Sequence, residues 1–145
     1  MNRANEMPQT NTPNAPSAIR CPCGSNKEYG QCCEPLHQGA PASSAEALMR
    51  SRYSAFAMNL LEYIDRSWHS STRPKSVGAE GGEMPRTRWM GLRIKRHEVI
   101  DANRAIVEFS ARYEARGRVS VMHEVSRFVL ENGHWFYVDG TFPRR

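Results

Sequence analysis

The chain has no long hydrophobic run and none of the short motifs that identify several common enzyme classes. No apolar segment approaches the roughly 20 residues that a transmembrane helix needs, so we expect no membrane partner. The sequence contains no glycine-rich phosphate-binding loop, no Gly-x-Ser-x-Gly nucleophile motif and no His-Glu-x-x-His motif. These absences leave no catalytic residue to assign, and they favour a non-enzymatic role over an enzyme.

Cysteine is absent after residue 33, although four cysteines lie close together before that point. They are Cys21, Cys23, Cys32 and Cys33. A segment this short cannot bury a useful apolar core, so something else must hold it. Tetrahedral coordination of one Zn²⁺ by four thiolates would do so. Because four cysteine ligands leave no open coordination position, we expect this zinc to be structural rather than catalytic.

The alternative interpretations of the cysteines are disulfides or a redox pair. Disulfides need an oxidising compartment, but residues 1–20 lack the apolar segment and cleavage site of a signal peptide. We therefore expect a cytoplasmic protein with reduced thiols. Cys-x-Cys and Cys-Cys disulfides would also close small, strained rings. Zinc is favoured over both alternatives, and His37 is a candidate spare ligand.

The spacing Cys-x-Cys-Gly-Ser-x-Lys-x-Tyr-x-x-Cys-Cys, from Cys21 to Cys33, resembles the SEC-C zinc knuckle. This motif is named for the tail of the SecA translocation motor, which docks the SecB chaperone and the ribosome. The resemblance implies that the knuckle docks a protein or ribonucleoprotein partner. The expected exposed contacts are Lys27, Glu28 and Tyr29. Gly24 and Ser25 supply a turn whose N–H groups are expected to point at sulfur.

The resemblance extends along the chain to the YchJ-like family, which has no assigned biochemical role. It is carried by five segments, residues 48–56, 63–69, 89–92, 123–128 and 135–140. Members of that family join a SEC-C knuckle to a nuclear-transport-factor-2-like (NTF2-like) domain. The resemblance therefore implies a cone in which helices pack on a curved antiparallel sheet.

Composition divides the chain into four parts. Residues 1–19 are rich in Asn, Pro, Thr and Gln and are predicted to form a disordered tail. The knuckle covers residues 20–36, a linker covers residues 37–42 and one domain covers residues 43–145. Charges balance before Ser43, so the whole excess of +5 lies in that domain. This positive charge favours either an acidic partner or a solvated surface.

Hydrophobic periodicity predicts helices first. Ser43-x-x-Glu46 is typical of a capping box at a helix start. Apolar residues then recur at helical spacing, at Ala45, Leu48, Met49, Tyr53, Phe56 and Leu60. A second short helix is predicted over residues 60–68, with Leu61, Ile64 and Trp68 facing inward. Proline and glycine in residues 70–87 predict a mobile loop.

From residue 88 the period changes to two. Strands are predicted over residues 89–99, 105–113, 119–130 and 135–139, with turns at 101–103, 116–117 and 132–133. Helices on one face of such an antiparallel meander give an α+β domain. This expectation agrees with the cone that the resemblance implies.

A fold of this kind encloses a pocket between sheet and helices. Its candidate polar lining residues are Arg52, Tyr53, Trp68, His69, Trp89, His123, Glu124, Arg127, Tyr137 and Asp139. From these we assign the pocket to Arg52, Tyr53, Trp68, His123, Arg127 and Asp139.

Strand alternation limits how the polar candidates cooperate. It separates His123 from Glu124, but it lets His123 bind an anion with Arg127 or meet Asp139 across strands. Arg52 lies among apolar residues and needs a carboxylate partner, for which Asp139, Glu124 and Glu62 are candidates.

Two functions follow from these features. In the first, the knuckle docks a partner and the protein acts as a zinc-binding accessory. In the alternative, the pocket binds or turns over a small molecule. Folds of this type commonly pair through the sheet face, so we also consider a homodimer.

Overall fold

The computed structural model describes residues 19–75 and 87–143. The predicted disordered tail, except for residue 19, and most of the predicted loop over residues 70–87 lie outside the described residues. The described elements are η4 (Tyr29–Gln31), α1 (Glu34–His37), α2 (Ala45–Met58), α3 (Leu61–Arg66), β1 (Thr87–Asp101), β2 (Arg104–Ala115), β3 (Arg118–Glu131) and β4 (His134–Thr141). None of the described helices is long and apolar enough to cross a membrane.

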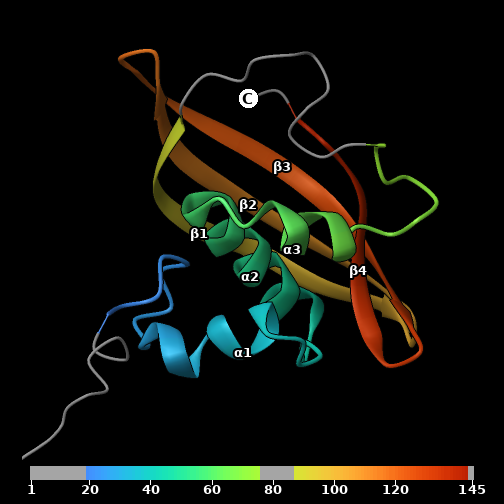
Figure 1. Cartoon of the computed structure of the whole chain (residues 1–145). Helices are drawn as coiled ribbons and strands as arrows, with labels where there is room; N and C mark the ends of the chain where they lie inside the picture. The colour runs from blue at the N-terminus through green and yellow to red at the C-terminus, as the bar shows by residue number, and fades with distance from the viewer. Residues whose placement is uncertain (1–18, 76–86, 144–145) are drawn as a thin grey trace, which may run out of the picture.

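The four strands form one antiparallel sheet in the order β1-β2-β3-β4 within the described part of the chain. The β2–β3 turn has positive φ at Arg116 and Gly117, and the β3–β4 turn has it at Asn132 and Gly133. Two such residues in a row suit the right-handed twist of a hairpin. Figure 1 shows α2 and α3 lying across one face of the long, curved strands. The prediction of an α+β fold with helices on a curved antiparallel sheet is confirmed.

Helix α2 begins one residue later than the sequence pattern indicated. The side chain of Ser44, not Ser43, caps it by accepting a hydrogen bond from the backbone N–H of Ala47. Glu46 therefore does not complete a capping box, because its position relative to Ser44 is one residue short. The carboxylate of Glu46 instead accepts a hydrogen bond from Arg50, one turn further along the helix.

The core lies between α2 and the concave face of the sheet. Alternate residues of β2 are buried, as the period of two indicated, and they pack with Phe128 of β3 against α2. Three cysteines belong to the same buried cluster. Its members are Cys21, Cys23, Cys33, Ala45, Leu48, Met49, Tyr53, Ala105, Val107, Phe109, Ala111 and Phe128. The cysteine segment is therefore continuous with the core of the domain.

The packing of α3 differs from the prediction. Leu61, expected to face inward, is 42% exposed, whereas Tyr63 and Ile64 are buried. The difference arises because α3 is a separate helix of less than two turns, so its buried side is set by contact with α2.

A β-bulge in β4 decides which side chains face the helices. Arg127 pairs with Asp139, but the next residue, Phe128, pairs with Tyr137, so Val138 is an extra residue. Such an insertion reverses the alternation of the strand. Tyr137 and Asp139, although two residues apart, consequently lie on opposite faces of the sheet.

Candidate metal centre and adjacent cavity

The four cysteine sulfur atoms lie within 4.8 Å of one another. The Sγ atom of Cys32 is 3.6 Å from that of Cys23 and 3.9 Å from that of Cys33. A tetrahedral site with Zn–S bonds of about 2.3 Å has S···S edges of roughly 3.8 Å. The cysteines are free, and these separations are much longer than an S–S bond of about 2.05 Å. The sulfur positions therefore fit four ligands of one metal ion.

Two reversals of the backbone bring the sulfur atoms together. Gly24 and Asn26 have positive φ, and the backbone N–H of Cys21 donates to the carbonyl of Lys27 across the turn. The 3₁₀ turn η4 then closes when the N–H of Cys32 donates to the carbonyl of Tyr29. Asn tolerates the left-handed region better than most non-glycine residues, which explains how Asn26 can adopt this conformation.

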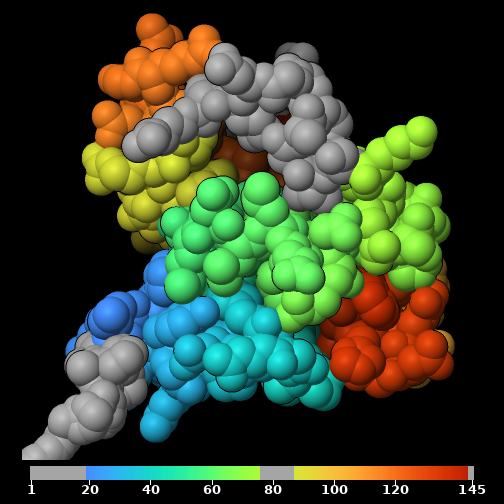
Figure 2. Space-filling view, in the orientation of Figure 1, coloured from blue at the N-terminus to red at the C-terminus, as the bar shows by residue number. Residues whose placement is uncertain are grey.

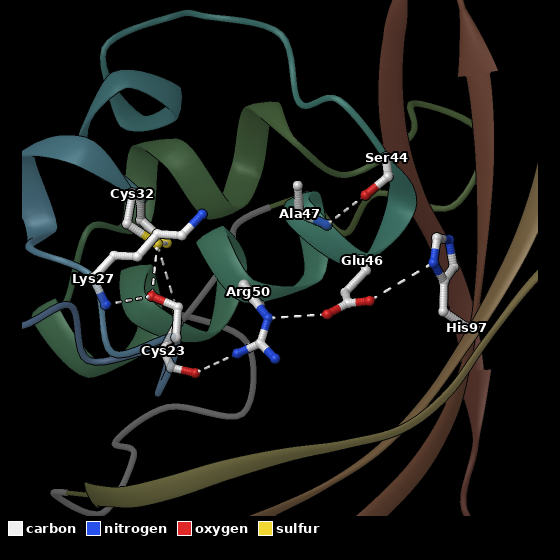
Figure 3. Close-up of polar contacts among 10 residues, drawn as sticks. Cys23, Lys27, Cys32, Ser44, Glu46, Ala47, Arg50 and His97 are labelled. Carbon is white, nitrogen blue, oxygen red and sulfur yellow. Dashed lines mark hydrogen bonds and ion pairs between the residues drawn. The ribbon is translucent and has the colours of Figure 1, made fainter.

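A hydroxyl group supports the sulfur atoms. The Ser25 Oγ atom lies 3.1 Å from the Cys32 Sγ atom, and the backbone N–H of Lys27 donates to the same Ser25 oxygen (Figure 3). Because that oxygen already accepts the N–H, its own proton is free to point at sulfur. The sequence predicted backbone N–H donors here. Backbone N–H groups of Cys23 and Ser25 do bond to the sulfur atoms of Cys21 and Cys23 and favour their thiolate forms, and the Ser25 hydroxyl adds a side-chain donor to Cys32.

The pKa values of the thiols show what binding of a metal ion would change. Hydrogen bonding to Cys23, together with burial, raises the pKa of Cys21 to about 11. Hydrogen bonding to Cys21 and Cys23 raises the pKa of Cys33 as well. Protein groups alone therefore keep these two thiols protonated. A metal ion that binds four thiolates would displace their protons.

A chain of polar contacts links the cysteine turn to the domain. Arg50 Nη1 of α2 donates to the carbonyl of Cys23 at 2.8 Å, and Arg50 Nε donates to Glu46 at 3.2 Å (Figure 3). The Glu46 carboxylate also lies 3.7 Å from Nδ1 of His97 on β1. These contacts connect the turn, α2 and the sheet.

His37 forms a second link and is not a fifth ligand. Its Nδ1 atom lies 2.7 Å from the hydroxyl of Tyr29, and its Nε2 atom lies 2.9 Å from the carbonyl oxygen of Ser51. Burial lowers the pKa of His37, which favours the neutral ring. The prediction of His37 as a spare ligand was wrong, because both of its nitrogen atoms are engaged away from the sulfur atoms.

The three predicted partner contacts do not share one environment. Lys27 and Glu28 are exposed on the outer side of the turn. Tyr29 is partly buried, packs against the core and contacts His37. The expectation that Tyr29 is an exposed contact was wrong, because its ring fills the joint between the turn and α2.

A cavity of about 280 Å³ lies between the sheet and the helices. It is lined by Met49, Arg52, Tyr53, Phe56, Trp68, Trp89, Phe109, Ala111, Met122, Glu124, Ser126 and Tyr137. Figure 2 shows the surface hollowed between the residues of β1 and those of α2 and α3, with strand residues at the bottom. Arg52, Tyr53 and Trp68 of the predicted pocket line this cavity.

Arg52 is held in the cavity wall without a carboxylate partner. Its side chain is 3% exposed, and its Nη1 atom donates to the carbonyl of Ile64 and to Ser67 Oγ. The guanidinium carbon lies 4.4 Å from the ring centroid of Tyr137. Burial lowers the pKa of Arg52 to about 10, which leaves it charged at neutral pH. The predicted ion pair is not found among the described residues, where ring faces and neutral oxygens hold the cation instead.

Glu124 is the buried carboxylate of the same cavity. Its Oε2 atom accepts hydrogen bonds from the hydroxyl groups of Tyr137 and Ser126, each at 2.9 Å. Burial raises the pKa of Tyr137, so this hydroxyl remains a donor. Opposite Ser126 on β4 stands Gly140, where any Cβ atom would overlap the carboxylate of Glu124. The glycine therefore provides the space in which Glu124 sits.

Three residues of the predicted pocket lie on the opposite face of the sheet. His123 Nε2 lies 2.7 Å from a carboxylate oxygen of Glu108, and Arg127 makes two hydrogen bonds to Asp139 at 2.6 and 2.7 Å. Their assignment to the cavity was wrong. Alternation places His123 and Arg127 on the outer face, and the bulge at Val138 places Asp139 there too.

The remaining polar candidates divide in the same way. Trp89 and Tyr137 line the cavity. His69 does not, because it pairs with Glu131 at the end of the sheet.

Comparison with known proteins agrees with this two-part architecture. Residues 20–35 match the family model described as the SEC-C motif, and residues 44–140 match the model described as YchJ, middle NTF2-like domain. The fold and the cysteine site thus define a SEC-C protein with an NTF2-like domain. The chain belongs to the YchJ-like family.

Relatives of similar length support this assignment. A UPF0225 protein of Ralstonia nicotianae is 47% identical over 135 residues, which cover 87% of this chain and 92% of the relative. A UPF0225 protein of Bordetella parapertussis is 44% identical over 131 residues, covering 88% and 95% of the two chains.

Two solved structures share the fold. The solution structure of a SEC-C motif containing protein from Rhodopseudomonas palustris is 31% identical with a TM-score of 0.74, covering 87% of this chain and 100% of that chain. The crystal structure of a SEC-C motif containing protein from Psychrobacter arcticus is 28% identical with a TM-score of 0.73, covering 90% and 86%. The predicted family and fold are confirmed.

Proposed function

We propose that this protein is a cytoplasmic, zinc-binding accessory protein whose knuckle docks another protein. The carrying observation is the division of the cysteine turn into two sides. Cys21, Cys23 and Cys33 are buried in the core of the domain, whereas Lys27 and Glu28 are exposed on the outer side. A metal-held turn offers these two side chains on a rigid frame, so less conformational entropy is lost when a partner binds.

The chemistry of the ligands supports zinc as the metal. Four thiolates in a closed tetrahedral arrangement are typical of structural Zn²⁺ sites. The ligands must also stay reduced to bind, which is the condition of the cytoplasm.

The exposed charges favour a protein surface over a nucleic acid. Binding to a phosphate backbone requires an excess of cations, whereas Lys27 and Glu28 are adjacent charges of opposite sign. A protein partner with a complementary pair fits both. An RNA-containing partner is the other outcome that the experiment must separate.

Native mass spectrometry tests the metal. We expect one zinc per chain in protein purified without chelator, and none in the Cys32→Ser/Cys33→Ser variant. Reduced wild-type protein that carries no zinc would overturn the metal assignment.

Crosslinking in cells tests the docking. We expect one specific crosslinked partner for the wild type and its loss in Lys27→Ala/Glu28→Ala. The matched control is Lys95→Ala/Glu62→Ala, which removes two exposed charges outside the knuckle. Equal loss in both variants, or in neither, would contradict docking through the knuckle. Loss of the partner after ribonuclease treatment would identify a ribonucleoprotein instead.

A second candidate function is binding of a small molecule in the cavity. Arg52 and Glu124 favour it, because both are almost fully buried and both line the same space. Buried charges are costly unless they are satisfied, so their retention in a cavity wall favours a bound polar group.

A homodimer that forms through the outer face of the sheet is a further proposal. That face carries exposed Val119 and Val121 beside paired charges such as Arg127–Asp139. Light scattering at increasing protein concentration, compared between the wild type and Val121→Glu, tests it. A wild-type mass of one chain at all concentrations would exclude it.

A further inference from the structure

The cavity contains polar atoms that the protein itself leaves without hydrogen bonds. In Arg52 only Nη1 is engaged by the described residues, which leaves Nε and Nη2 without a partner there. The indole Nε1 of Trp68 is buried, and it has no partner among the described residues. Glu124 accepts both of its hydrogen bonds at Oε2, so Oε1 accepts none within the same part of the chain. Arg52 therefore offers donor atoms and Glu124 offers one acceptor in the cavity wall, and the buried indole N–H of Trp68 becomes a second donor when neighbouring side chains shift to let a ligand reach it.

The charges of this wall favour a neutral ligand. An organic anion could pair with Arg52, but it would share the cavity with the carboxylate of Glu124. An organic cation could pair with Glu124, but it would share the cavity with the guanidinium of Arg52. A neutral group with one acceptor and one donor satisfies both sides without either conflict.

The rest of the cavity favours a flat ring. Tyr53, Phe56, Trp89 and Phe109 supply aromatic surface around the polar wall. The Trp89 ring lies 5.8 Å from the Tyr53 ring and 6.1 Å from the Phe56 ring, centroid to centroid. Aromatic side chains pack well against planar rings, and a volume of about 280 Å³ suits a molecule of one or two rings.

We propose that the cavity binds a small, neutral, ring-bearing amide or lactam. The amide carbonyl accepts hydrogen bonds from Arg52 and from the indole N–H of Trp68, and the amide N–H donates to Oε1 of Glu124. The ring lies between the aromatic side chains. This inference rests on the second candidate function and names its ligand class; it does not depend on docking through the knuckle.

Three probes of similar size and different charge test which ligand charge the cavity prefers. Benzamide offers an acceptor and a donor, benzoate offers acceptors with a negative charge, and benzamidine offers donors with a positive charge. Each is titrated into protein labelled with ¹⁵N at tryptophan, and the indole N–H signals are followed. Trp68 and Trp89 line this cavity, whereas Trp135 lines a separate cavity of about 270 Å³, so a shift of the Trp135 signal reports binding outside the proposed site.

We expect benzamide to bind saturably at least tenfold more tightly than benzoate or benzamidine. The Trp68 indole signal should move downfield, because its N–H gains an acceptor, while the Trp135 signal stays in place. Tighter binding of benzoate or benzamidine would overturn the amide assignment and leave the cavity as a binding site. No saturable shift with any probe would overturn both the ligand class and the second candidate function.

Glu124→Gln gives the sharpest variant. We expect the oxygen of the new amide to stay where Oε2 was, because the hydroxyl groups of Tyr137 and Ser126 donate there in the wild type. Its NH₂ group then stands at the position of Oε1 and meets the N–H of the ligand with another donor. We expect benzamide binding to weaken at least tenfold and benzoate binding to strengthen. An unchanged order of affinities would overturn the proposed orientation.

Two further variants keep the proposal testable if Glu124→Gln folds poorly. Glu108→Gln makes the same chemical change on the outer face of the sheet, beside His123, and should leave all affinities unchanged. Trp68→Phe removes the indole N–H but keeps an aromatic ring, and should weaken benzamide several-fold. Unchanged benzamide affinity in Trp68→Phe would remove Trp68 from the site and overturn the proposed contacts.

Discussion

The two regions of this protein are held together by different forces, although they share one core. The domain is organised by apolar side chains on α2, β2 and β3. The cysteine turn is organised by sulfur atoms that fit one metal ion. Yet Cys21, Cys23 and Cys33 belong to the same buried cluster as Leu48 and Phe128. The cysteine turn is therefore a part of the domain's core and not only an attached module.

This difference has a consequence for how each region fails. Free cysteine packs like a small hydrophobe, so the sulfur atoms contribute burial with or without a metal. If the four thiolates bind zinc as proposed, the ligand bonds supply most of the stability of the turn, and backbone hydrogen bonds such as that from the Cys21 N–H to the Lys27 carbonyl add to it. Loss of the metal and loss of a core side chain should consequently damage different parts of the molecule.

Removal of the metal should give the largest effect. Apparent binding free energies of structural zinc in small peptides are about 10–16 kcal/mol, so a chelator removes most of what holds the turn. We expect the amides of residues 20–38 to lose their protection from hydrogen exchange, while those in the centre of β2 and β3 keep it. The melting temperature of the whole chain should also fall, because the turn packs on the core.

The reciprocal control removes a core side chain and leaves the metal ligands intact. Phe128→Ala should lower the free energy of unfolding by about 3–5 kcal/mol, since Phe128 is fully buried. Val121→Ala, on the exposed outer face, should change it by less than about 0.5 kcal/mol. Both variants should keep one metal ion per chain. Loss of protection throughout β2 and β3 on chelation would instead show that the domain cannot fold without its knuckle.

The sequence predicted the fold well because its strongest signals are local and periodic. The alternation from Ala105 to Ala111 identified the buried face of β2, and Asn132-Gly133 identified a hairpin turn. The N-cap of α2 at Ser44 was harder to predict, because either of two adjacent serines can accept the hydrogen bond from the helix and tertiary packing chooses between them.

The site was predicted less completely, because its geometry depends on features that have no sequence pattern. The bulge at Val138 turns Asp139 away from the cavity, and no alternation rule can foresee an inserted residue. Arg50 gave no signal of its contact with Cys23, since the two residues are far apart along the chain. Gly140 was a weak signal in retrospect, because an isolated glycine in a strand often marks a close approach.

A smaller effect is expected at the joint between the two regions. Arg50→Gln removes the charged hydrogen bond to the Cys23 carbonyl, worth about 1–2 kcal/mol for a partly exposed side chain. We expect the metal to transfer to a chromogenic chelator several-fold to tenfold faster, with little change in the melting of the domain. Arg127→Gln, which breaks an exposed ion pair on the outer face, is the matched control and should leave the transfer rate unchanged. Equal rates in Arg50→Gln and the wild type would show that the knuckle holds its metal without help from α2.

The smallest expected effect is the pH dependence that His37 causes, because His37 also links the cysteine turn to α2. Burial lowers the pKa of His37 in the folded protein, so the unfolded chain binds the proton more readily. The contribution of neutral His37 is therefore complete above its unfolded pKa of about 6.5 and is lost as the pH falls below it. We expect the free energy of unfolding to fall between pH 7 and pH 5.5 more steeply in the wild type than in His37→Gln, with the metal content of both proteins matched. Parallel curves for the two proteins would mean that His37 does not couple the protonation of the joint to the stability of the fold, and that acid acts on the thiolate ligands alone.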